Sequence, residues 1–338
     1  MLAVENLTIA FRTDEGRITP VAGVSFALEA GRTLGLVGES GSGKSVTTKA
    51  LMRLLPGSAE IAPHSRIRYR TKAGETIDVA SLRPGDRRLR RLRGGEIGMI
   101  FQEPMASFSP VYTIGNQMIE AIRLHRGLDR RAAREHAVEM LGRVGISDPG
   151  ARIDQYPHAL SGGMRQRAMI ALALAAGPRL LVADEPTTAL DVTIQAQVLD
   201  LMRALQRELG MAMIFITHDL GVVAQVADEI AVMYLGAIVE RGPARAVLKD
   251  PQHPYTRGLL AAIPSTTRLA GRLEPVPGDI PSPSARPAGC PFHPRCTIAR
   301  RGLCDVVEPG ETVLPGGRAA RCHLLGAAPA AETGRSAA

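Results

Sequence analysis

The sequence predicts an α/β fold built on a mostly parallel sheet, and the alternation of strand and helix patterns is the main reason. Short apolar runs typical of buried strands occur at 33–37, 97–101, 180–183 and 212–217. Segments with apolar residues at helical spacing separate them, and this alternation is typical of parallel sheets. A chain of 338 residues with 45% hydrophobic content is long enough for one large domain and a smaller one.

The N-terminal part predicts an antiparallel β subdomain before the α/β core begins. Residues 1–30 alternate apolar and polar side chains, which indicates antiparallel strands with a turn near 14–16. The strand at 33–37 follows, and we expect a helix over 45–55. Residues 56–100 are polar, and we expect them to be irregular until the next strand.

The rest of the chain predicts a helical insertion and an irregular extension. Apolar residues recur at helical spacing from about residue 104 to 160, which indicates an inserted helical subdomain. Further helices are expected at 165–176 and 193–209. Pro, Gly and Arg become frequent after Gly242, and the segment 275–287 is expected to form neither a helix nor a central strand. The predicted domains are 1–250, an extension over 251–325 and a frayed tail over 326–338.

The composition argues against direct binding of nucleic acid. The formal net charge is +8, but aromatic residues make up only 3% and Trp is absent, too few for base-stacking platforms. The densest basic run, 83–93, is short, so we attribute the charge to a solvated or membrane-proximal face. Glu5 interrupts the N-terminal apolar pattern, and no run of about 20 apolar residues occurs, so a soluble protein without signal peptide or membrane span is expected.

Residues 38–45 (GESGSGKS) fit the phosphate-binding pattern G-x-x-x-x-G-K-[ST]. Glycines let backbone N–H groups curl round phosphates, and the start of the following helix adds its positive dipole end. Lys44 is expected to neutralise the β- and γ-phosphates, and the Ser45 hydroxyl to bind Mg²⁺. The predicted ATP-binding residues of this segment are Gly38, Ser40, Gly41, Gly43, Lys44, Ser45 and Val46.

Two carboxylates end the apolar strand LLVADE. Asp184 is expected to hold Mg²⁺, and Glu185 to orient and polarise the attacking water. An acidic strand end before the turn at Pro186 is the alternative. The phosphate-binding loop upstream favours the catalytic interpretation.

Two more polar residues end other strands of the predicted sheet, where ligands bind in α/β folds. His218 follows the strand at 212–217 and is expected to contact the γ-phosphate. Gln102 follows the strand at 97–101 and is expected to touch both Mg²⁺ and the attacking water. A structural histidine and a solvent-facing glutamine are the alternatives.

The segment 160–166 (LSGGMRQ) is a second loop that can bind an anion before a helix. Ser161 can cap that helix while Gly162 and Gly163 expose N–H groups, although a plain N-cap followed by two glycines is the alternative. One chain cannot bring both of its loops around one nucleotide. The pairing therefore predicts an ATPase whose active site a second subunit completes.

The motifs resemble those of the ATP-binding-cassette (ABC) ATPases over residues 1–250; in order they are GESGSGKS, Gln102, LSGGM, LLVADE, Ala189-Leu190-Asp191 and His218. The resemblance implies a P-loop NTPase (RecA-like) core that hydrolyses ATP with Mg²⁺. It also implies head-to-tail pairing of two cassettes, either two homologous chains or two copies, so that Ser161 and Gly163 of one close on the γ-phosphate held by the other. Asp191 would couple the two sites, and Phe11 would stack on adenine unless it is a core strand residue.

Further segments resemble the ATPase subunits of oligopeptide and dipeptide importers; they are 102–113, 156–158, 183–197 and His253-Pro254-Tyr255 with the cysteine tail. This resemblance implies two transmembrane permease subunits that contact the helical subdomain, and an extracytoplasmic solute-binding protein. The chain would act peripherally at the cytoplasmic face of the membrane. Related importers of nickel, glutathione or oligosaccharides keep the solute open. A cassette acting on nucleic acid or ribosomes, and a redox module whose cassette only switches, are the other classes.

Four cysteines occur in the C-terminal segment, with the spacing Cys290-x5-Cys296-x7-Cys304-x17-Cys322. Structural zinc usually takes closely spaced C-x2–4-C pairs, and none occurs here. Four thiolates from an irregular segment suit a [4Fe–4S] cluster, with Zn²⁺ and unligated or disulfide-bonded thiols as the alternatives. His293 and His323 are close enough in sequence to act as substitute ligands.

Overall fold

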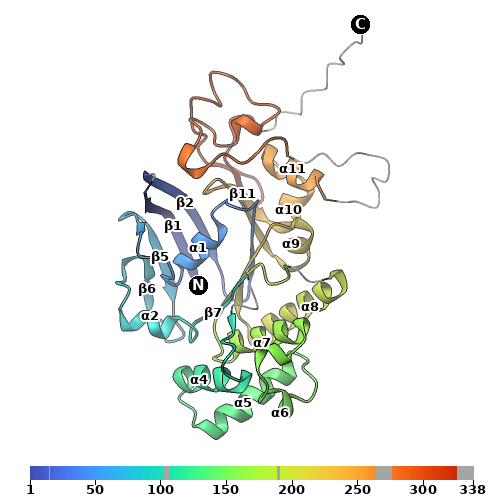
Figure 1. Cartoon of the computed structure of the whole chain (residues 1–338). Coiled ribbons are helices and arrows are strands. Elements are labelled where there is room, and N and C mark those ends of the chain that lie inside the picture. Colours follow the sequence, from blue (N-terminus) through green and yellow to red (C-terminus); the bar gives the residue numbers. More distant parts are fainter. Residues whose placement is uncertain (15, 103–106, 189–190, 264–275, 326–338) are drawn as a thin grey trace.

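The computed structural model describes residues 1–14, 16–102, 107–188, 191–263 and 276–325. Glu15, Ala189, Leu190 and the predicted tail 326–338 therefore lie outside the described residues. Within these ranges the chain forms two sheets, with helices around the larger one and an irregular C-terminal segment at one end (Figure 1).

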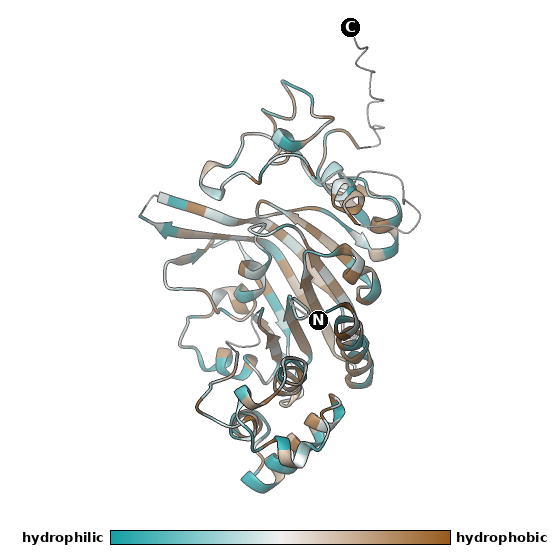
Figure 2. Ribbon diagram, turned by 45° about the vertical axis from the view of Figure 1, so that its right-hand side comes forward, coloured by the Kyte–Doolittle hydropathy of each residue, from teal (hydrophilic) through white to brown (hydrophobic). Residues whose placement is uncertain are grey.

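The larger sheet has eight strands in the order β12-β13-β11-β10-β3-β9-β8-β7. Its central strands are β7 (Ile97–Ile100), β8 (Leu180–Asp184), β9 (Ala212–Thr217), β3 (Thr33–Val37) and β10 (Glu229–Tyr234), all parallel to their neighbours in this group. β3, β8 and β9 are buried along their whole length. Figure 2 shows brown, hydrophobic residues gathered in the sheet at the centre of the molecule. The predicted α/β core is confirmed.

The smaller sheet is antiparallel, in the order β2-β1-β5-β6, with β4 paired to β1. Its strands are β1 (Leu2–Thr13), β2 (Gly16–Leu28), β4 (Ala59–Ile61), β5 (Arg66–Arg70) and β6 (Thr76–Asp78). The predicted N-terminal antiparallel pair is confirmed. The prediction that 56–100 is irregular is wrong, because this segment adds three strands, a 3₁₀ turn η1 (Val79–Ser81) and a helix α2 (Arg87–Leu92).

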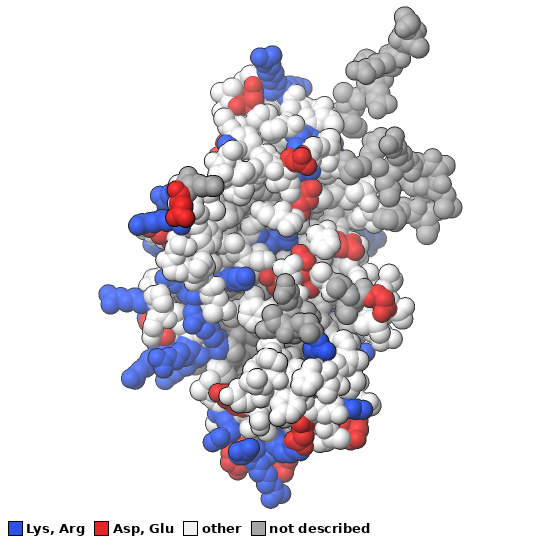
Figure 3. Space-filling model, viewed as in Figure 1, with Lys and Arg blue, Asp and Glu red and all other residues white. Residues whose placement is uncertain are grey.

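The regular elements of this segment are too short to stand out in the sequence. In β5 the arginines are exposed while Ile67 and Tyr69 are buried, so a regular strand alternates strongly polar with apolar side chains. Helix α2 begins where Asp86 accepts a hydrogen bond of 2.8 Å from the Arg88 N–H, and it buries only Leu89 and Leu92. On the face drawn in Figure 3, Lys and Arg gather over this region and at the end formed by the helical insertion.

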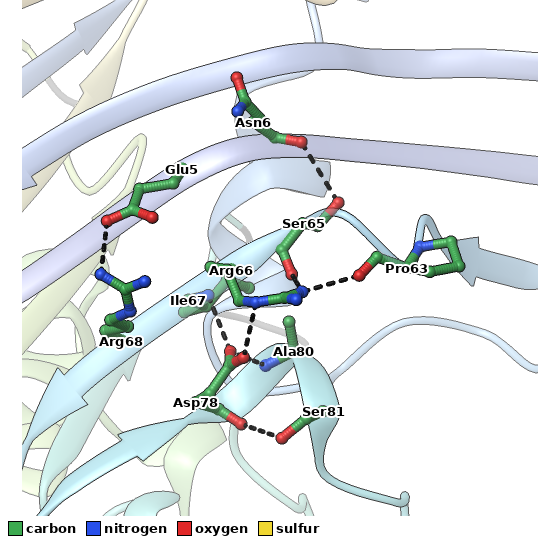
Figure 4. A network of polar contacts seen from close by, with 10 residues as sticks. All are labelled: Glu5, Asn6, Pro63, Ser65, Arg66, Ile67, Arg68, Asp78, Ala80 and Ser81. Atoms are coloured by element: carbon green, nitrogen blue, oxygen red, sulfur yellow. Dashed lines mark hydrogen bonds and ion pairs between the residues drawn. The ribbon is translucent and has the colours of Figure 1, made fainter.

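Side-chain hydrogen bonds connect the strands of the smaller sheet (Figure 4). The Asp78 carboxylate accepts hydrogen bonds from the N–H groups of Ile67 and Ala80, at 3.0 and 3.2 Å. Arg68 of β5 donates to the Glu5 carboxylate of β1 at 2.9 Å. These contacts fix the turn after β6 and the position of β5 beside β1.

A helical insertion follows β7 and forms the lower part of the molecule in Figure 1. Its described elements are α4 (Ile114–Arg126), α5 (Arg130–Arg143), α6 (Pro149–Arg152) and a 3₁₀ turn η2 (Pro157–Ala159). Thr113 and Asp129 cap α4 and α5 through their side-chain oxygens. Helices α7 (Gly162–Leu174) and α8 (Val192–Leu209) then return to the large sheet, close to the predicted bounds.

The first core helix is shorter than expected. Helix α1 (Lys44–Ala50) follows the phosphate-binding pattern, whereas the predicted helix runs on to Leu55. Turns replace the helix at Leu51, and Arg53 has a left-handed φ of 53°, which a helix cannot contain.

The C-terminal part packs on the edge of the large sheet. Its elements are α9 (Leu220–Val226), β11 (Ala237–Pro243), α10 (Ala244–Lys249), α11 (Pro254–Ala261), η3 (Pro283–Ala285), η4 (His293–Arg295), β12 (Thr312–Leu314) and β13 (Arg318–Ala320). In the described part of 275–287 the only regular element is the 3₁₀ turn η3, as expected. The pairing of β13 with β11 is not predicted by the sequence, and it attaches the cysteine-bearing segment to the core. None of the helices in the described ranges is both long and apolar enough to cross a membrane.

Candidate functional site

The loop between β3 and α1 has a backbone shape that only glycine permits at two positions. A Cβ on Gly38 would lie 2.2 Å from the Met233 carbonyl oxygen. A Cβ on Gly43 would lie 2.3 Å from the Pro20 carbonyl oxygen, and Gly43 also has a φ of 99°. The loop is thus held closely between its neighbours, while Ser40 and Gly41 at its tip are exposed. This is the shape that a loop needs to present N–H groups to phosphates.

Lys44 is buried at the base of this loop. Its ammonium group donates to the carbonyl oxygens of Gly38 and Glu39, at 2.7 and 2.8 Å, and to the Ser42 hydroxyl at 3.3 Å. Burial lowers the pKa of Lys44, and the nearby carboxylates of Glu185, Asp184 and Glu39 act in the opposite direction. The loop therefore holds a positive charge at its centre, although that charge is costly to bury.

Ser45 and Asp184 meet where α1 begins and β8 ends. The Ser45 hydroxyl donates to the Asp184 carboxylate at 3.1 Å, and Asp184 is buried. Burial raises the pKa of Asp184, as does the neighbouring Glu185, whereas the Ser45 hydrogen bond, Lys49 and Lys44 lower it. The Ser45 hydroxyl beside the carboxylates of Asp184 and Glu185, in a partly buried site, suits a hard divalent cation. Such a cation would stabilise the charged form of Asp184. These residues fit the predicted Mg²⁺.

Glu185 lies at the centre of the predicted catalytic residues. Its carboxylate accepts hydrogen bonds from the Gln102 amide at 3.2 Å and from the Thr188 hydroxyl at 3.0 Å. The His218 Nδ1 lies 3.5 Å from the other Glu185 carboxylate oxygen. Glu185 also has a φ of 47°, a strained value for a residue with a side chain and one often found at functional sites. Three strand ends of the sheet thus converge on one carboxylate.

The segment with Ser161, Gly162 and Gly163 begins helix α7, away from α1 (Figure 1). The Ser161 hydroxyl accepts a hydrogen bond of 3.3 Å from the Met164 N–H, so the predicted N-cap is confirmed. Ser161 and Gly162 are exposed and Gly163 is half-buried. The start of α7 therefore presents its N–H groups outward.

Two contacts around this segment are not predicted by the sequence. Gln166 is buried in α7, and its amide donates to the carbonyl of Pro186, directly after Glu185. Asp191 caps α8 by accepting from the Ile194 N–H at 2.9 Å. A glutamine in the first turns of a helix gives no signal in the sequence that it will contact a distant turn.

Phe11 and Val46 are half-buried side chains that pack against the same hydrophobic core as the smaller sheet. Phe11 lies opposite Ile18 in the β1–β2 pair and opposite Ala59 of β4. These contacts agree with the core-residue alternative, and stacking of Phe11 on adenine stays a prediction.

The four cysteines lie near one another in the extension as free thiols. Burial raises the pKa of Cys290 to about 11, and the proximity of the other three thiols adds to this shift. Backbone N–H groups donate to all four sulfurs, from Phe292 to Cys290, Ile298 to Cys296, Arg300 to Cys304 and Leu324 to Cys322. In the described part of the chain, however, no three His, Cys, Asp or Glu side chains are arranged to hold a metal ion. The predicted iron–sulfur cluster is therefore not supported by this arrangement.

Comparison with known proteins finds a family match for the ATPase core and another for the C-terminal extension. Residues 21–188 match the family "ABC transporter", and residues 239–304 match the family "Oligopeptide/dipeptide transporter, C-terminal region". A Brucella abortus (strain 2308) protein described as a peptide import ATP-binding protein is 51% identical over 315 residues, covering 91% of this chain and 93% of the relative. A Brucella suis biovar 1 protein with the same description is 51% identical over 323 residues, covering 95% and 94%.

Solved structures of ATP-binding cassettes share the fold. The dimeric cassette MJ0796 in a post-hydrolysis state with ADP and Pi superposes with a TM-score of 0.62 at 26% identity, covering 72% of this chain and 99% of that chain. CbiO1 from Clostridium perfringens, part of an ABC transporter complex, superposes with a TM-score of 0.60 at 26% identity, covering 74% and 90%. With its glycine loop, buried lysine and converging carboxylates, the chain belongs to the ATP-binding proteins of the ABC transporter family, and it carries the C-terminal region of the oligopeptide/dipeptide transporters.

Proposed function

We propose that this chain is the ATP-hydrolysing subunit of an importer that takes up dipeptides and oligopeptides. The observation that carries the enzymatic part is the Glu185 carboxylate, which Gln102, Thr188 and His218 surround beside the Ser45–Asp184 pair. The solute class is supported by the relatives described as peptide import ATP-binding proteins and by the C-terminal region that the chain shares with them.

The phosphate chain of ATP would bind in the loop 38–45. Gly41, Gly43 and the residues that open α1 offer backbone N–H groups, and the Lys44 ammonium supplies the positive charge. The Ser45 hydroxyl and the Asp184 carboxylate would hold Mg²⁺, with the Gln102 amide oxygen within the same group of side chains. When bound, Mg²⁺ neutralises charge that develops on the phosphate oxygens.

Glu185 acts as the base in this proposal. One carboxylate oxygen accepts a hydrogen bond from the attacking water and takes its proton as the water oxygen bonds to the γ-phosphorus. The bond between the γ-phosphorus and the β–γ bridging oxygen breaks in the same step, and ADP leaves with that oxygen. The hydrogen bonds from Gln102 and Thr188 keep the carboxylate oriented, at 3.2 and 3.0 Å. His218, with its side chain 59% exposed beside Glu185, would contact the γ-phosphate in this proposal.

A second cassette completes the site in this proposal. The exposed start of α7 in one chain would close on the γ-phosphate that the loop of the other chain holds. The match to a cassette whose structure is described as dimeric, with ADP and Pi, supports this arrangement. Asp191, which caps α8, would couple the two active sites of the dimer. The partner is a second copy or a homologous chain.

Two permease subunits would dock on the helical insertion. A cavity of about 440 Å³ lies between α4 and the turns after α1, and its apolar rim includes Phe101 and Leu124, which are 42% and 75% exposed. We propose that a short helix of a permease fills this groove and so transmits cassette closure to the membrane. In this assembly the chain acts at the cytoplasmic face of the membrane, and an extracytoplasmic binding protein delivers the peptide.

The proposal predicts that peptide uptake depends on this chain and on its contact with the permeases. In cells that lack the chain, uptake of a labelled tripeptide should return with the wild type and not with Glu185→Gln. Leu124→Glu should lower the amount of permease that co-purifies several-fold, because it places a charge in the apolar groove. Val313→Glu, at a site that is 78% exposed on β12, is the matched control. Full uptake with Glu185→Gln, together with loss of uptake in the cysteine variants, would instead favour a redox module.

We also propose that the extension 251–325 takes up a [4Fe–4S] cluster on Cys290, Cys296, Cys304 and Cys322. The proposal rests on the supply of four thiol ligands within one irregular segment, not on their present arrangement. Because no three of these ligands are yet in place, binding would rearrange the segment. Protein purified without oxygen should be brown and contain about four iron and four sulfide per chain. One zinc per colourless chain, or no metal at all, would contradict the cluster.

A further inference from the structure

Arg295 and Tyr255 of the C-terminal extension both bind Glu39, the second residue of the phosphate-binding loop. The Arg295 guanidinium forms a two-pronged ion pair with the Glu39 carboxylate, at 2.7 and 3.1 Å. The Tyr255 hydroxyl accepts a hydrogen bond of 2.9 Å from the Glu39 backbone N–H. Both the side chain and the backbone of Glu39 are therefore held by a part of the chain that follows the whole ATPase core.

Arg295 is fixed on several sides. Its side chain is only 3% exposed, and its Nε donates to the Pro277 carbonyl at 2.9 Å. Its guanidinium carbon lies 5.7 Å from the centre of the Tyr234 ring. A flexible surface arginine contributes little through an ion pair, but a buried, bidentate and pre-oriented one binds its partner strongly.

Tyr255 is equally constrained. It is fully buried, with its ring centre 4.7 Å from that of Tyr234 and 5.4 Å from that of Phe292. Its backbone N–H donates to Nδ1 of His253 at 3.1 Å, and the His253 N–H donates to the buried Glu240 at 2.9 Å. The packing of Tyr255 against Tyr234 and Phe292 fixes the position of the Tyr255 hydroxyl.

Glu39 connects Arg295 and Tyr255 to the Lys44 ammonium. The Glu39 carbonyl accepts a hydrogen bond from the Lys44 ammonium at 2.8 Å. The side chain, N–H and carbonyl of Glu39 are thus bound to Arg295, Tyr255 and Lys44 respectively. A shift of Glu39 would move an oxygen that positions the Lys44 ammonium.

We propose that Arg295 and Tyr255 form a clamp that holds the phosphate-binding loop in its ATP-ready shape. Both are positioning residues that act through Glu39. The clamp lowers the conformational cost of binding ATP, because the loop does not have to order itself around the phosphates. This inference rests on the proposed ATPase function, and it gives the peptide-transporter extension a role in nucleotide binding. The alternative is that the contacts only attach the extension to the core.

The test compares ATP affinity with stability in the full-length chain. Tyr255→Phe removes only the hydroxyl and should weaken binding of a fluorescent ATP analogue about 3- to 10-fold. Arg295→Gln should weaken it about 10-fold or more, and Arg295→Lys should restore part of the loss because it keeps one charged donor. The Km for ATP should rise in parallel, with a smaller change in kcat.

Arg286→Ala is the matched control. Arg286 belongs to the same extension, donates to the Leu235 carbonyl at 2.8 Å and pairs with Glu308 at 3.2 Å, but it does not bind the loop. Its thermal melting temperature should fall at least as far as that of Tyr255→Phe, while its ATP affinity stays at the wild-type value. In a double-mutant cycle, Glu39→Gln with Arg295→Gln should weaken ATP binding no more than the worse single variant.

Unchanged ATP affinity in both Tyr255→Phe and Arg295→Gln would overturn the clamp, and so would a loss of affinity in Arg286→Ala that matches theirs. Additive effects of Glu39→Gln and Arg295→Gln would also contradict it. In each of these cases a wild-type chain that hydrolyses ATP leaves the proposed function standing. A wild-type chain that neither binds nor hydrolyses ATP, with its partner subunits present, would contradict the proposed function instead.

Discussion

Glu185→Gln is expected to reduce ATP turnover by about 10²- to 10⁴-fold, the range over which a general base contributes. The amide keeps the size of the side chain but cannot take a proton from water. ATP binding should remain, because Lys44 and the loop are untouched and the loss of one carboxylate lowers the negative charge near the phosphates. The variant should therefore accumulate as a cassette dimer with trapped ATP.

Single-turnover assays and size-exclusion chromatography with ATP check this result. Glu208→Gln is a suitable control. Glu208 is exposed on α8 and pairs with Arg143 at 2.9 Å, and neither residue belongs to the predicted site. Turnover of Glu185→Gln at the wild-type rate would show that another group takes the proton. A variant that binds no ATP would instead mean that the strained backbone at Glu185 needs the carboxylate.

Lys44→Ala is expected to weaken ATP binding by about 10- to 100-fold, the loss that follows when a charged donor to phosphate is removed. It should also abolish the ATP-driven dimer. The alanine leaves the carbonyls of Gly38 and Glu39 without their donor, so the loop should lose order as well as charge. Global stability should change little, because burying the ammonium already lowers the pKa of Lys44 and offsets its hydrogen bonds.

Equilibrium binding of ATP and thermal melting, measured together, separate these effects. Lys249→Ala, at an exposed position on α10, should bind ATP like the wild type. A Lys44→Ala protein with normal ATP affinity would exclude this lysine from phosphate binding. A large fall in melting temperature would show instead that its main role is structural.

Contiguous motifs were predictable because their geometry is local. The loop from Gly38 to Ser45 needs only a strand before it and a helix after it, and β3 and α1 supply both. The two carboxylates at the end of β8 follow from the same reasoning, since parallel strands place their carboxyl ends at one edge. The segment 56–100 differs from its prediction because its elements are short: β5 is a five-residue strand, and α2 is a six-residue helix that buries only Leu89 and Leu92. Sequence spacing of the cysteines predicts a cluster, yet spacing says nothing about whether their sulfurs are arranged to share one metal.

The order of residues along the chain was enough to establish the nucleotide chemistry, because each phosphate-binding or carboxylate motif is a short, continuous piece of backbone. Folding alone decided which distant groups touch these motifs. Gln102 reaches Glu185 because β7 and β8 pair in parallel, and Arg295 reaches Glu39 across 256 positions because the extension packs its aromatic side chains on the sheet. Such contacts depend on packing and strand pairing between remote segments, and no local pattern encodes them.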